Sequence, residues 1–220
     1  MSVFAHDFLS AEQAKLVTLQ VKHLEWLHMD RGGFYTLGAA TYQDDPLAYP
    51  AIAEAFNKPI YRTMKVLYEK LWCELPVIMG VNLPCSTPYS GLALPSFHIF
   101  DHKSQGLSGS VHVDEPYDRV DLSAYDWRDP FSFTVPVELP TLGGGCDFWF
   151  DYTDKDIEIF AASGELPPST YVPYELGKLY LHDGMTPHRI ANPNPIPEGE
   201  YRITLQGHGF VTDKDIIVYF

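Results

Sequence analysis

A histidine and an aspartate two positions apart, His112 and Asp114, are the first residues in this chain whose types and spacing could do chemistry. Residues 110–115 alternate as a strand does, so both side chains are expected on the same face. Two side chains on one strand face can take adjacent positions around one metal ion. The pair alone carries little weight, because a chain of 220 residues with nine histidines contains such triplets by chance.

A second triplet of the same kind, His28-Met29-Asp30, illustrates the point. It comes at the end of a predicted helix, where residues two apart point to nearly opposite sides. We therefore exclude it as a metal site.

A residue farther along the chain could complete a site around His112 and Asp114. His188 follows Pro187 at the start of a predicted short strand, residues 187–191, and would add a second imidazole. Two histidines and one carboxylate leave positions on the metal open, and this set is diagnostic of non-haem Fe(II) oxygenases.

The predicted strand at 201–210 has a polar face. Arg202, Thr204, Gln206 and His208 alternate there with apolar residues and glycines. Arg202 would present a planar cationic fork to a carboxylate, and Thr204 would place a hydroxyl beside it. The alternatives are a surface ion pair for Arg202 and ordinary strand roles for Thr204 and the histidines.

The order of these residues, HxD followed by a distal His and then Arg-x-Thr, resembles that of the Fe(II)/2-oxoglutarate-dependent dioxygenases. GKLYLHDGMTPHRI is similar to the segment of that family that leads to the distal histidine, and GGGCDFWF resembles its glycine-rich fourth strand. The opening DFLSAEQAKLV resembles the amino-terminal brace of the prolyl-hydroxylase-like members. The resemblance covers residues 96–210 and, more weakly, 4–30.

The resemblance implies a double-stranded β-helix, a cupin-like jelly roll, with iron held by His112, Asp114 and His188. 2-Oxoglutarate would chelate the iron and pair its far carboxylate with Arg202, helped by Thr204, and O2 would take the last position. The implied reaction hydroxylates an unactivated C–H bond of a small molecule, an amino acid or a natural-product intermediate, and releases succinate and CO2. Halogenases of this family have Ala or Gly in place of the carboxylate, so Asp114 favours hydroxylation.

Other residues are candidates for contact with cosubstrate or substrate. His98 lies on a predicted strand that often contacts the cosubstrate in this fold, and Asp147 could meet a substrate ammonium if it, rather than Cys146, points inward. Tyr117 and Trp127 could form pocket walls. The alternatives are a core or surface histidine, a turn aspartate and aromatic side chains that anchor loops.

The amino-terminal part of the chain is predicted to be helical. A capping-box pattern at Ser10 predicts a helix from Ala11 to the glycines at 32–33. A second helical region begins near Pro50, is interrupted by Pro59 and then resumes. These helices lack the apolar area for a domain of their own, so we expect two to three helices to brace a sheet.

The rest of the chain is predicted to be mainly β. Short strands separated by turns, without helices between them, favour a jelly roll. The chain is expected to form a single domain, 1–220, with a helical brace at 1–75 and the β core at 96–210, and segments 117–130 and 151–170 are expected to be loops and candidate lids. The predicted strands are 96–102, 110–115, 131–138, 145–150, 171–175, 178–182, 187–191 and 201–210, with a further one at 215–220.

The composition bears on partners and location. A formal charge of -14 argues against nucleic acid or an anionic membrane as the main partner. The three cysteines form no CxxC pair, and no signal peptide or membrane-spanning run is apparent, so a cytoplasmic protein is expected. The alternative function is a cupin-like metal-dependent isomerase or ligand-binding protein that does not use 2-oxoglutarate. Such a protein would have no need for Arg202.

Overall fold

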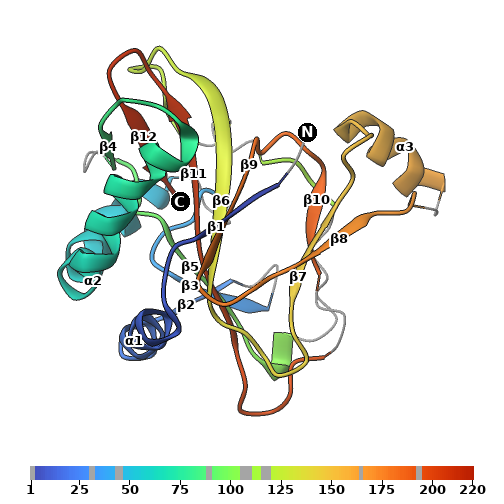
Figure 1. Ribbon diagram of the computed structural model, residues 1–220, viewed down its shortest axis with the longest axis horizontal. Helices are drawn as coiled ribbons and strands as arrows, with labels where there is room; N and C mark the ends of the chain where they lie inside the picture. Colours follow the sequence, from blue (N-terminus) through green and yellow to red (C-terminus); the bar gives the residue numbers. More distant parts are fainter. Residues whose placement is uncertain are drawn as a thin grey trace.

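Two sheets, antiparallel except for the pairing of β12 with β4, form the centre of the protein, as seen in a computed structural model that describes residues 3–29, 33–42, 47–87, 91–104, 111–114, 120–163, 166–191 and 195–220 (Figure 1). In this part of the chain the larger sheet has the strand order β1-β9-β6-β11-β5-β3-β2, and β12 pairs with β11 and β4. The smaller sheet has the order β10-β7-β8. The fold is the predicted double-stranded β-helix.

The strands that build the two sheets are short apart from the central pair. β6 (Arg128–Glu138) and β11 (Arg202–Val211) run antiparallel through the middle of the larger sheet. The others are β1 (Phe4–Asp7), β2 (Leu27–Met29), β3 (Phe34–Leu37), β4 (Cys85–Ser86), β5 (Ser96–Phe100), β7 (Gly145–Phe148), β8 (Thr170–Pro173), β9 (Lys178–His182), β10 (His188–Ala191) and β12 (Ile216–Tyr219).

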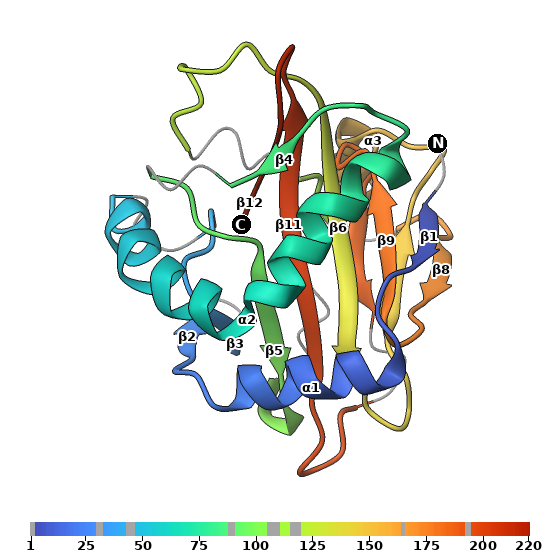
Figure 2. The ribbon, with the colours of Figure 1, turned by 60° about the vertical axis from the view of Figure 1, so that its left-hand side comes forward.

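The two faces of β11 have different neighbours because strand side chains alternate. Ile203 and Leu205 belong to the main apolar core, together with buried residues of both amino-terminal helices. Arg202, on the other face, donates a hydrogen bond from Nη2 to the Gly145 carbonyl oxygen of β7 at 3.1 Å. The helices therefore cover one face of the larger sheet, and the smaller sheet lies against the other (Figures 1 and 2).

Helix α1 (Ala11–Lys22) begins with the predicted capping box. Gln13 N donates to Ser10 Oγ at 3.2 Å, and Ser10 N donates to Gln13 Oε1 at 2.9 Å. Thr18 Oγ1 donates to the Val137 carbonyl oxygen at 2.8 Å and so joins the helix to β6. The helix ends earlier than the sequence predicted, and His28 lies on β2 instead of a helix.

Helix α2 (Tyr49–Met79) crosses the same face of the sheet (Figure 2). The predicted interruption at Pro59 is wrong, because the helix continues through it and leaves helical geometry at Met64 (φ -118°, ψ 26°). Asn57 and Tyr68 donate hydrogen bonds to the carbonyl oxygens of Leu92 and Pro95, both at 2.8 Å. These bonds join α2 to the segment that enters β5.

Two further expectations were wrong. The predicted strand at 110–115 does not form over the described residues 111–114, which make a single β-bridge between His112 and His188. The predicted loop at 151–170 contains helix α3 (Asp154–Ser163). The sequence carries a signal for this helix, because Thr153 directly precedes it and threonine is a favoured N-cap residue. In the structure, Asp156 N donates to Thr153 Oγ1 at 3.3 Å. Among the described residues, no helix has both the length and the apolar character to cross a bilayer.

Candidate metal centre and cosubstrate pocket

Backbone hydrogen bonds, rather than a strand, position His112 and Asp114. His112 N donates to the His188 carbonyl oxygen at 3.0 Å, and His188 N donates to the His112 carbonyl oxygen at 2.9 Å. Asp114 N donates to the Gly184 carbonyl oxygen at 2.8 Å. The segment 111–114 is thereby held against the chain that leads from β9 into β10.

The three predicted metal ligands lie together. One ligand atom from each of His112, Asp114 and His188 lies within 4.8 Å of the others. His112 Nε2 is 3.6 Å from Asp114 Oδ1, and His188 Nε2 is 3.4 Å from Asp114 Oδ2. Two imidazole nitrogens and two carboxylate oxygens therefore converge on one point.

The ring of His188 is oriented by a backbone contact. Its Nδ1 lies 2.9 Å from the Thr186 carbonyl oxygen, which can only accept, so Nδ1 carries the hydrogen. The lone pair of Nε2 is therefore directed toward Asp114, as it is in a histidine that ligates a metal. Burial lowers the pKa of His188, although Asp114 opposes the shift, and this favours the neutral ring that metal binding requires.

Asp114 is surrounded by histidines. Burial alone would raise the pKa of Asp114, but His188, His208 and His112 act in the opposite direction and the net pKa is well below its usual value. Asp114 is therefore an ionised carboxylate beside imidazole nitrogens. This is the donor set expected for a divalent transition metal.

Gly184 permits the close approach of the chain to Asp114. Its φ of +76° lies in the left-handed region, which residues with a Cβ rarely adopt. A Cβ there would lie 3.2 Å from Ser132 Oγ and 3.5 Å from Asp114 Cβ. A side chain at this position would be tight against Ser132 and in ordinary van der Waals contact with Asp114.

Two more histidines, His182 and His208, lie beside the cluster, and neither was predicted to be a site residue. His182 Nδ1 accepts from Gly184 N at 3.2 Å, and its ring centroid is 4.8 Å from that of His188. Burial lowers the pKa of His182 to about 3, helped by His188. His208 Nδ1 shares a hydrogen bond with Ser132 Oγ at 3.0 Å and lies 3.9 Å from Asp114 Oδ2. The alternation of β11, which puts His208 on the face of Arg202, was the signal for this residue.

Arg202 is fully buried and has two unused donors. Nη2 donates to Gly145, whereas Nε and Nη1 meet no hydrogen-bond acceptor in the described part of the protein. Its guanidinium carbon is 5.4 Å from the ring centroid of Tyr174 and 5.6 Å from that of Phe100. Burial lowers the pKa of Arg202, but a guanidinium stays charged in proteins. A buried cation with unused donors is costly unless an anion completes it.

Thr204 and His98 adjoin Arg202 through the sheet register. Thr204 is fully buried and pairs with His98, and Arg202 pairs with Phe100 on the same two strands. His98 Nε2 shares a hydrogen bond with the Tyr42 hydroxyl, and its buried Nδ1 has no partner among the described residues. Burial, with a contribution from the charge of Arg202, lowers the pKa of His98 to about 3, so the ring is neutral.

Tyr174 and Cys146 also lie near Arg202, and neither was predicted to bind the cosubstrate. Burial raises the pKa of Tyr174, whose hydroxyl interacts with Thr134 and Cys146. Burial likewise raises the pKa of the Cys146 thiol to about 12, against an opposing effect of Arg202. Both groups are thus neutral donors or weak acceptors near the cation, and neither neutralises it.

The three residues predicted to contact the substrate, Asp147, Trp127 and Tyr117, do not lie together in the structure as described. Asp147 lies on the face of β7 opposite Cys146, and its Oδ2 is 3.0 Å from both Nε and Nη2 of Arg189. The structure therefore pairs Asp147 with Arg189 and does not bring it to the metal ligands, so its contact with a substrate stays a prediction. Trp127 lines a cleft next to Asp114, and Tyr117 lies outside the described residues.

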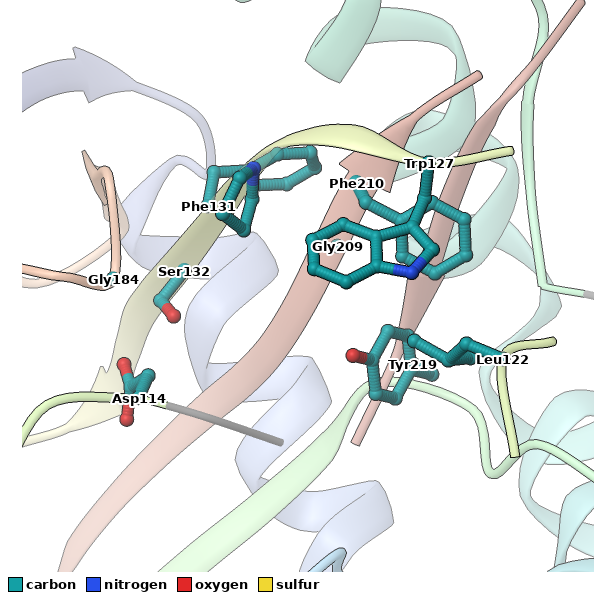
Figure 3. A pocket seen from close by; sticks show the side chains of 10 residues that line it. Asp114, Leu122, Trp127, Phe131, Ser132, Gly184, Gly209, Phe210 and Tyr219 are labelled. Atoms are coloured by element: carbon teal, nitrogen blue, oxygen red, sulfur yellow. The ribbon is translucent and has the colours of Figure 1, made fainter. Parts of the chain in front are cut away.

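The cleft beside Asp114 is bounded by two kinds of side chain (Figure 3). Asp114 and Ser132 lie on one side, and the aromatic rings of Trp127, Phe210 and Tyr219 lie on the other (Figure 3). The enclosed volume of the cleft is about 10 Å³, which is room for about one water molecule.

Known proteins match this chain only at the level of structure. No protein-family model matches the sequence, and no curated protein matches it. An N-substituted L-amino acid dioxygenase from Burkholderia ambifaria AMMD aligns with a TM-score of 0.63 and 12% identity, over 99% of this chain and 86% of that chain.

Two more solved structures have similar folds. The non-heme alpha-ketoglutarate-dependent epimerase SnoN from nogalamycin biosynthesis aligns with a TM-score of 0.52 and 16% identity, over 94% of this chain and 78% of its own. A 2OG-Fe(II) oxygenase family oxidoreductase from Burkholderia pseudomallei aligns with a TM-score of 0.51 and 9% identity, over 96% of this chain and 85% of its own. At these identities the likeness shows a common fold.

Proposed function

We propose that this protein is an Fe(II)- and 2-oxoglutarate-dependent oxygenase that hydroxylates an unactivated C–H bond of a small molecule and releases succinate and CO2. The observation that carries the proposal is the convergence of His112, Asp114 and His188, in a protein that also buries Arg202 with two unused donors. Of the proteins with a similar fold, one is named a dioxygenase, one a non-heme alpha-ketoglutarate-dependent epimerase and one a 2OG-Fe(II) oxygenase. That likeness supports the reaction class by analogy.

The three side chains fit an iron ion. Metal–ligand bonds of about 2.1 Å at right angles separate neighbouring ligand atoms by roughly 3 Å. The distances from Asp114 to His112 and His188, 3.6 and 3.4 Å, are close to that separation. Two imidazoles and one carboxylate would leave three positions of an octahedral ion for a chelating cosubstrate and O2.

The unused donors of Arg202 suit a carboxylate. Nη1 and Nη2 of Arg202 form the end-on edge of the guanidinium fork, which matches the two oxygens of a carboxylate, and Nε is a further unused donor. Thr204 would add a hydroxyl, and His98 Nδ1 is a further unpartnered polar atom on the neighbouring strand. We propose Arg202 and Thr204 as the binding site for the far carboxylate of 2-oxoglutarate, with His98 beside it.

When bound, iron and 2-oxoglutarate supply the oxidising power for an O2-dependent attack on a C–H bond. The residues of the chain would hold the metal and its ligands and keep them oriented. Thr186 sets the tautomer of His188, and Phe148 stacks on the His188 ring with a centroid distance of 5.7 Å, which limits access of water. Asp114 keeps its charge at neutral pH and therefore lowers the net charge of the bound metal.

The alternative, a cupin-like isomerase or ligand-binding protein without 2-oxoglutarate, leaves Arg202 unexplained. A fold of this kind can bind metal through the same three side chains, but it has no use for a buried cation with unused donors. Hydroxylation is preferred over halogenation because Asp114 occupies the position that a halide would need.

Anaerobic reconstitution with Fe(II) and 2-oxoglutarate tests the proposal. The chelate has a weak visible charge-transfer band, which we expect in the unvaried protein and not in Asp114→Ala. Oxygen should then release succinate when a substrate is present. A protein that binds Fe(II) through these residues but forms no such band on addition of 2-oxoglutarate would contradict the proposal and favour the cupin-like alternative.

A further inference from the structure

We propose that Ser132 and His208 position the carboxylate of Asp114 through one bound water molecule. In this series of hydrogen bonds the His208 ring donates to the Ser132 hydroxyl, the hydroxyl donates to the water, and the water donates to Asp114. The proposal rests on the proposed function for the metal that Asp114 would ligate. It adds two positioning residues to the site and names the hydrogen bond that each of them donates.

Ser132 and His208 face each other on the two central strands of the larger sheet. They are register partners on β6 and β11, and both side chains are buried. Ser132 Oγ lies 3.0 Å from His208 Nδ1, which is a hydrogen-bond distance. His208 Nδ1 is 3.9 Å from Asp114 Oδ2, which is too far for a direct hydrogen bond. Polar groups at such a separation can be joined by a water molecule.

The enclosed part of the cleft beside Asp114 has room for that water. Its volume is about 10 Å³, close to the minimum that one water molecule needs. Asp114, Ser132 and Tyr219 all line it. Figure 3 shows the hydroxyl of Ser132 directed toward Asp114 and the hydroxyl of Tyr219 at the end of its ring nearer to Asp114. A buried water makes about two to four hydrogen bonds, so these three groups are enough to hold it.

The charge of Asp114 sets the direction of the hydrogen bonds. An ionised carboxylate only accepts, so the water donates to it. The carboxylate also favours the tautomer of His208 with the hydrogen on Nδ1, because a lone pair on that nitrogen would face a negative charge. His208 Nδ1 then donates to Ser132 Oγ, and the hydroxyl hydrogen of Ser132 is left for the water. Hydrogen bonds in such a series polarise and strengthen one another in a buried environment.

The hydrogen bond from the water would hold the side chain of Asp114 in one orientation. The backbone of Asp114 is fixed by the bond from its N–H to the Gly184 carbonyl oxygen, but that bond does not set the torsion angles of the side chain. Ligating carboxylates in proteins are themselves hydrogen-bonded, and loss of such a partner typically lowers metal affinity about 10- to 100-fold. Ser132 and His208 would therefore act on the metal through Asp114.

A high-resolution crystal structure of the Zn(II)-loaded protein tests for the water. We expect one ordered water within about 3 Å of both Ser132 Oγ and a carboxylate oxygen of Asp114. A structure in which no water lies between these two groups would overturn the proposal.

Zn(II) affinity, measured by competition with a chelator and without 2-oxoglutarate, tests the positioning role. Ser132→Ala and His208→Leu should each lower the affinity about tenfold. His208→Asn should stay within about threefold of the unvaried protein, because the asparagine amide can donate from the position of Nδ1. A purely structural role predicts the reverse order for the two His208 variants, since leucine fills the buried volume better than asparagine. Thr18→Val, which removes a buried hydroxyl that joins α1 to β6, is the matched control and should leave the affinity unchanged.

Equal Zn(II) affinities for Ser132→Ala and the unvaried protein overturn the proposal, and so does an affinity of His208→Asn as low as that of His208→Leu. Failure of the proposed function has a different signature. The charge-transfer band with Fe(II) and 2-oxoglutarate would be missing from the unvaried protein, while the differences in Zn(II) affinity among the variants would persist. A protein that binds no Zn(II) would overturn both proposals.

Discussion

The two halves of the candidate site are built in different ways. Arg202 and Thr204 lie on β11, in the middle of the larger sheet, where the register with β5 fixes their faces. His112 and Asp114 lie on a segment without strand structure, held by three backbone hydrogen bonds to residues 184 and 188. The strand-built half depends on local alternation, and the loop-built half depends on contacts between distant parts of the chain.

The difference extends to electrostatics. In the loop-built half the charge of Asp114 has imidazole partners on more than one side. In the strand-built half the charge of Arg202 has one carbonyl partner and two unused donors. Removal of each charge should therefore affect stability and ligand binding differently.

The largest effect is expected for Asp114→Ala. Loss of the carboxylate removes the only anionic metal ligand of the proposed set, so Fe(II) affinity should fall by more than about 100-fold, and succinate release should stop. Anaerobic Fe(II) titration measures the affinity. Asp147→Ala, which removes a carboxylate paired with Arg189, is the control and should retain Fe(II) binding. Equal Fe(II) affinities for Asp114→Ala and the unvaried protein would exclude Asp114 as a ligand.

Arg202→Met should weaken 2-oxoglutarate about 30- to 100-fold, since two charge-assisted hydrogen bonds are lost at about 1.5–3 kcal/mol each before partial compensation. Fe(II) affinity should not change. The thermal stability of the ligand-free protein should stay equal or rise, because a buried, incompletely paired cation is removed. Thermal unfolding with and without 2-oxoglutarate measures both effects. A large loss of stability without ligand would show that Arg202 is a structural residue.

Gly184→Ala should act on the loop-built half without removing any functional group. The positive φ and the contact at 3.2 Å with Ser132 Oγ predict a loss of about 1–2 kcal/mol in the free energy of unfolding. Fe(II) affinity should fall several-fold, because a shift of the strained backbone moves the Gly184 carbonyl oxygen, which accepts from Asp114 N. Urea denaturation measures the stability. Gly199→Ala, at a positive φ with no atom within 4 Å of the added Cβ, separates backbone strain from contact with Ser132.

Thr204→Val should have the smallest effect. It keeps the shape of the buried side chain and removes one neutral hydroxyl, so 2-oxoglutarate should bind about 5-fold more weakly, in line with a hydrogen bond worth about 1 kcal/mol. The visible charge-transfer band of the Fe(II)–2-oxoglutarate chelate should persist at the same wavelength. An effect as large as that of Arg202→Met would mean that Thr204, and not the cation, dominates the clamp.

The strand-built half could be anticipated from the sequence. The alternation at 201–210 placed Arg202, Thr204 and His208 on one face, and the structure has them there. The capping box at Ser10 and most strands after residue 95 also follow from local patterns. Their roles in binding metal or cosubstrate remain predictions.

The loop-built half could be predicted in composition but not in geometry. The sequence pointed to His112 and Asp114, yet the strand that was to align them does not form in the described residues. Tyr174 was missed because nothing local marks a tyrosine between a strand and a turn as the neighbour of a buried arginine. Helix α3 was missed despite the Thr153 cap, because an acidic segment after a strand was read as a loop.

By itself, the sequence determined the alternation of β11, the start of α1 and the supply of two histidines, a carboxylate and an arginine in a suggestive order. Those features depend on backbone geometry and residue type, which act over a few residues. Tertiary structure alone decided that Asp114 faces His188, that Arg202 retains two unused donors and that Trp127 shares a cleft with Asp114. These depend on hydrogen bonds and packing between segments far apart in the chain, which no short pattern specifies.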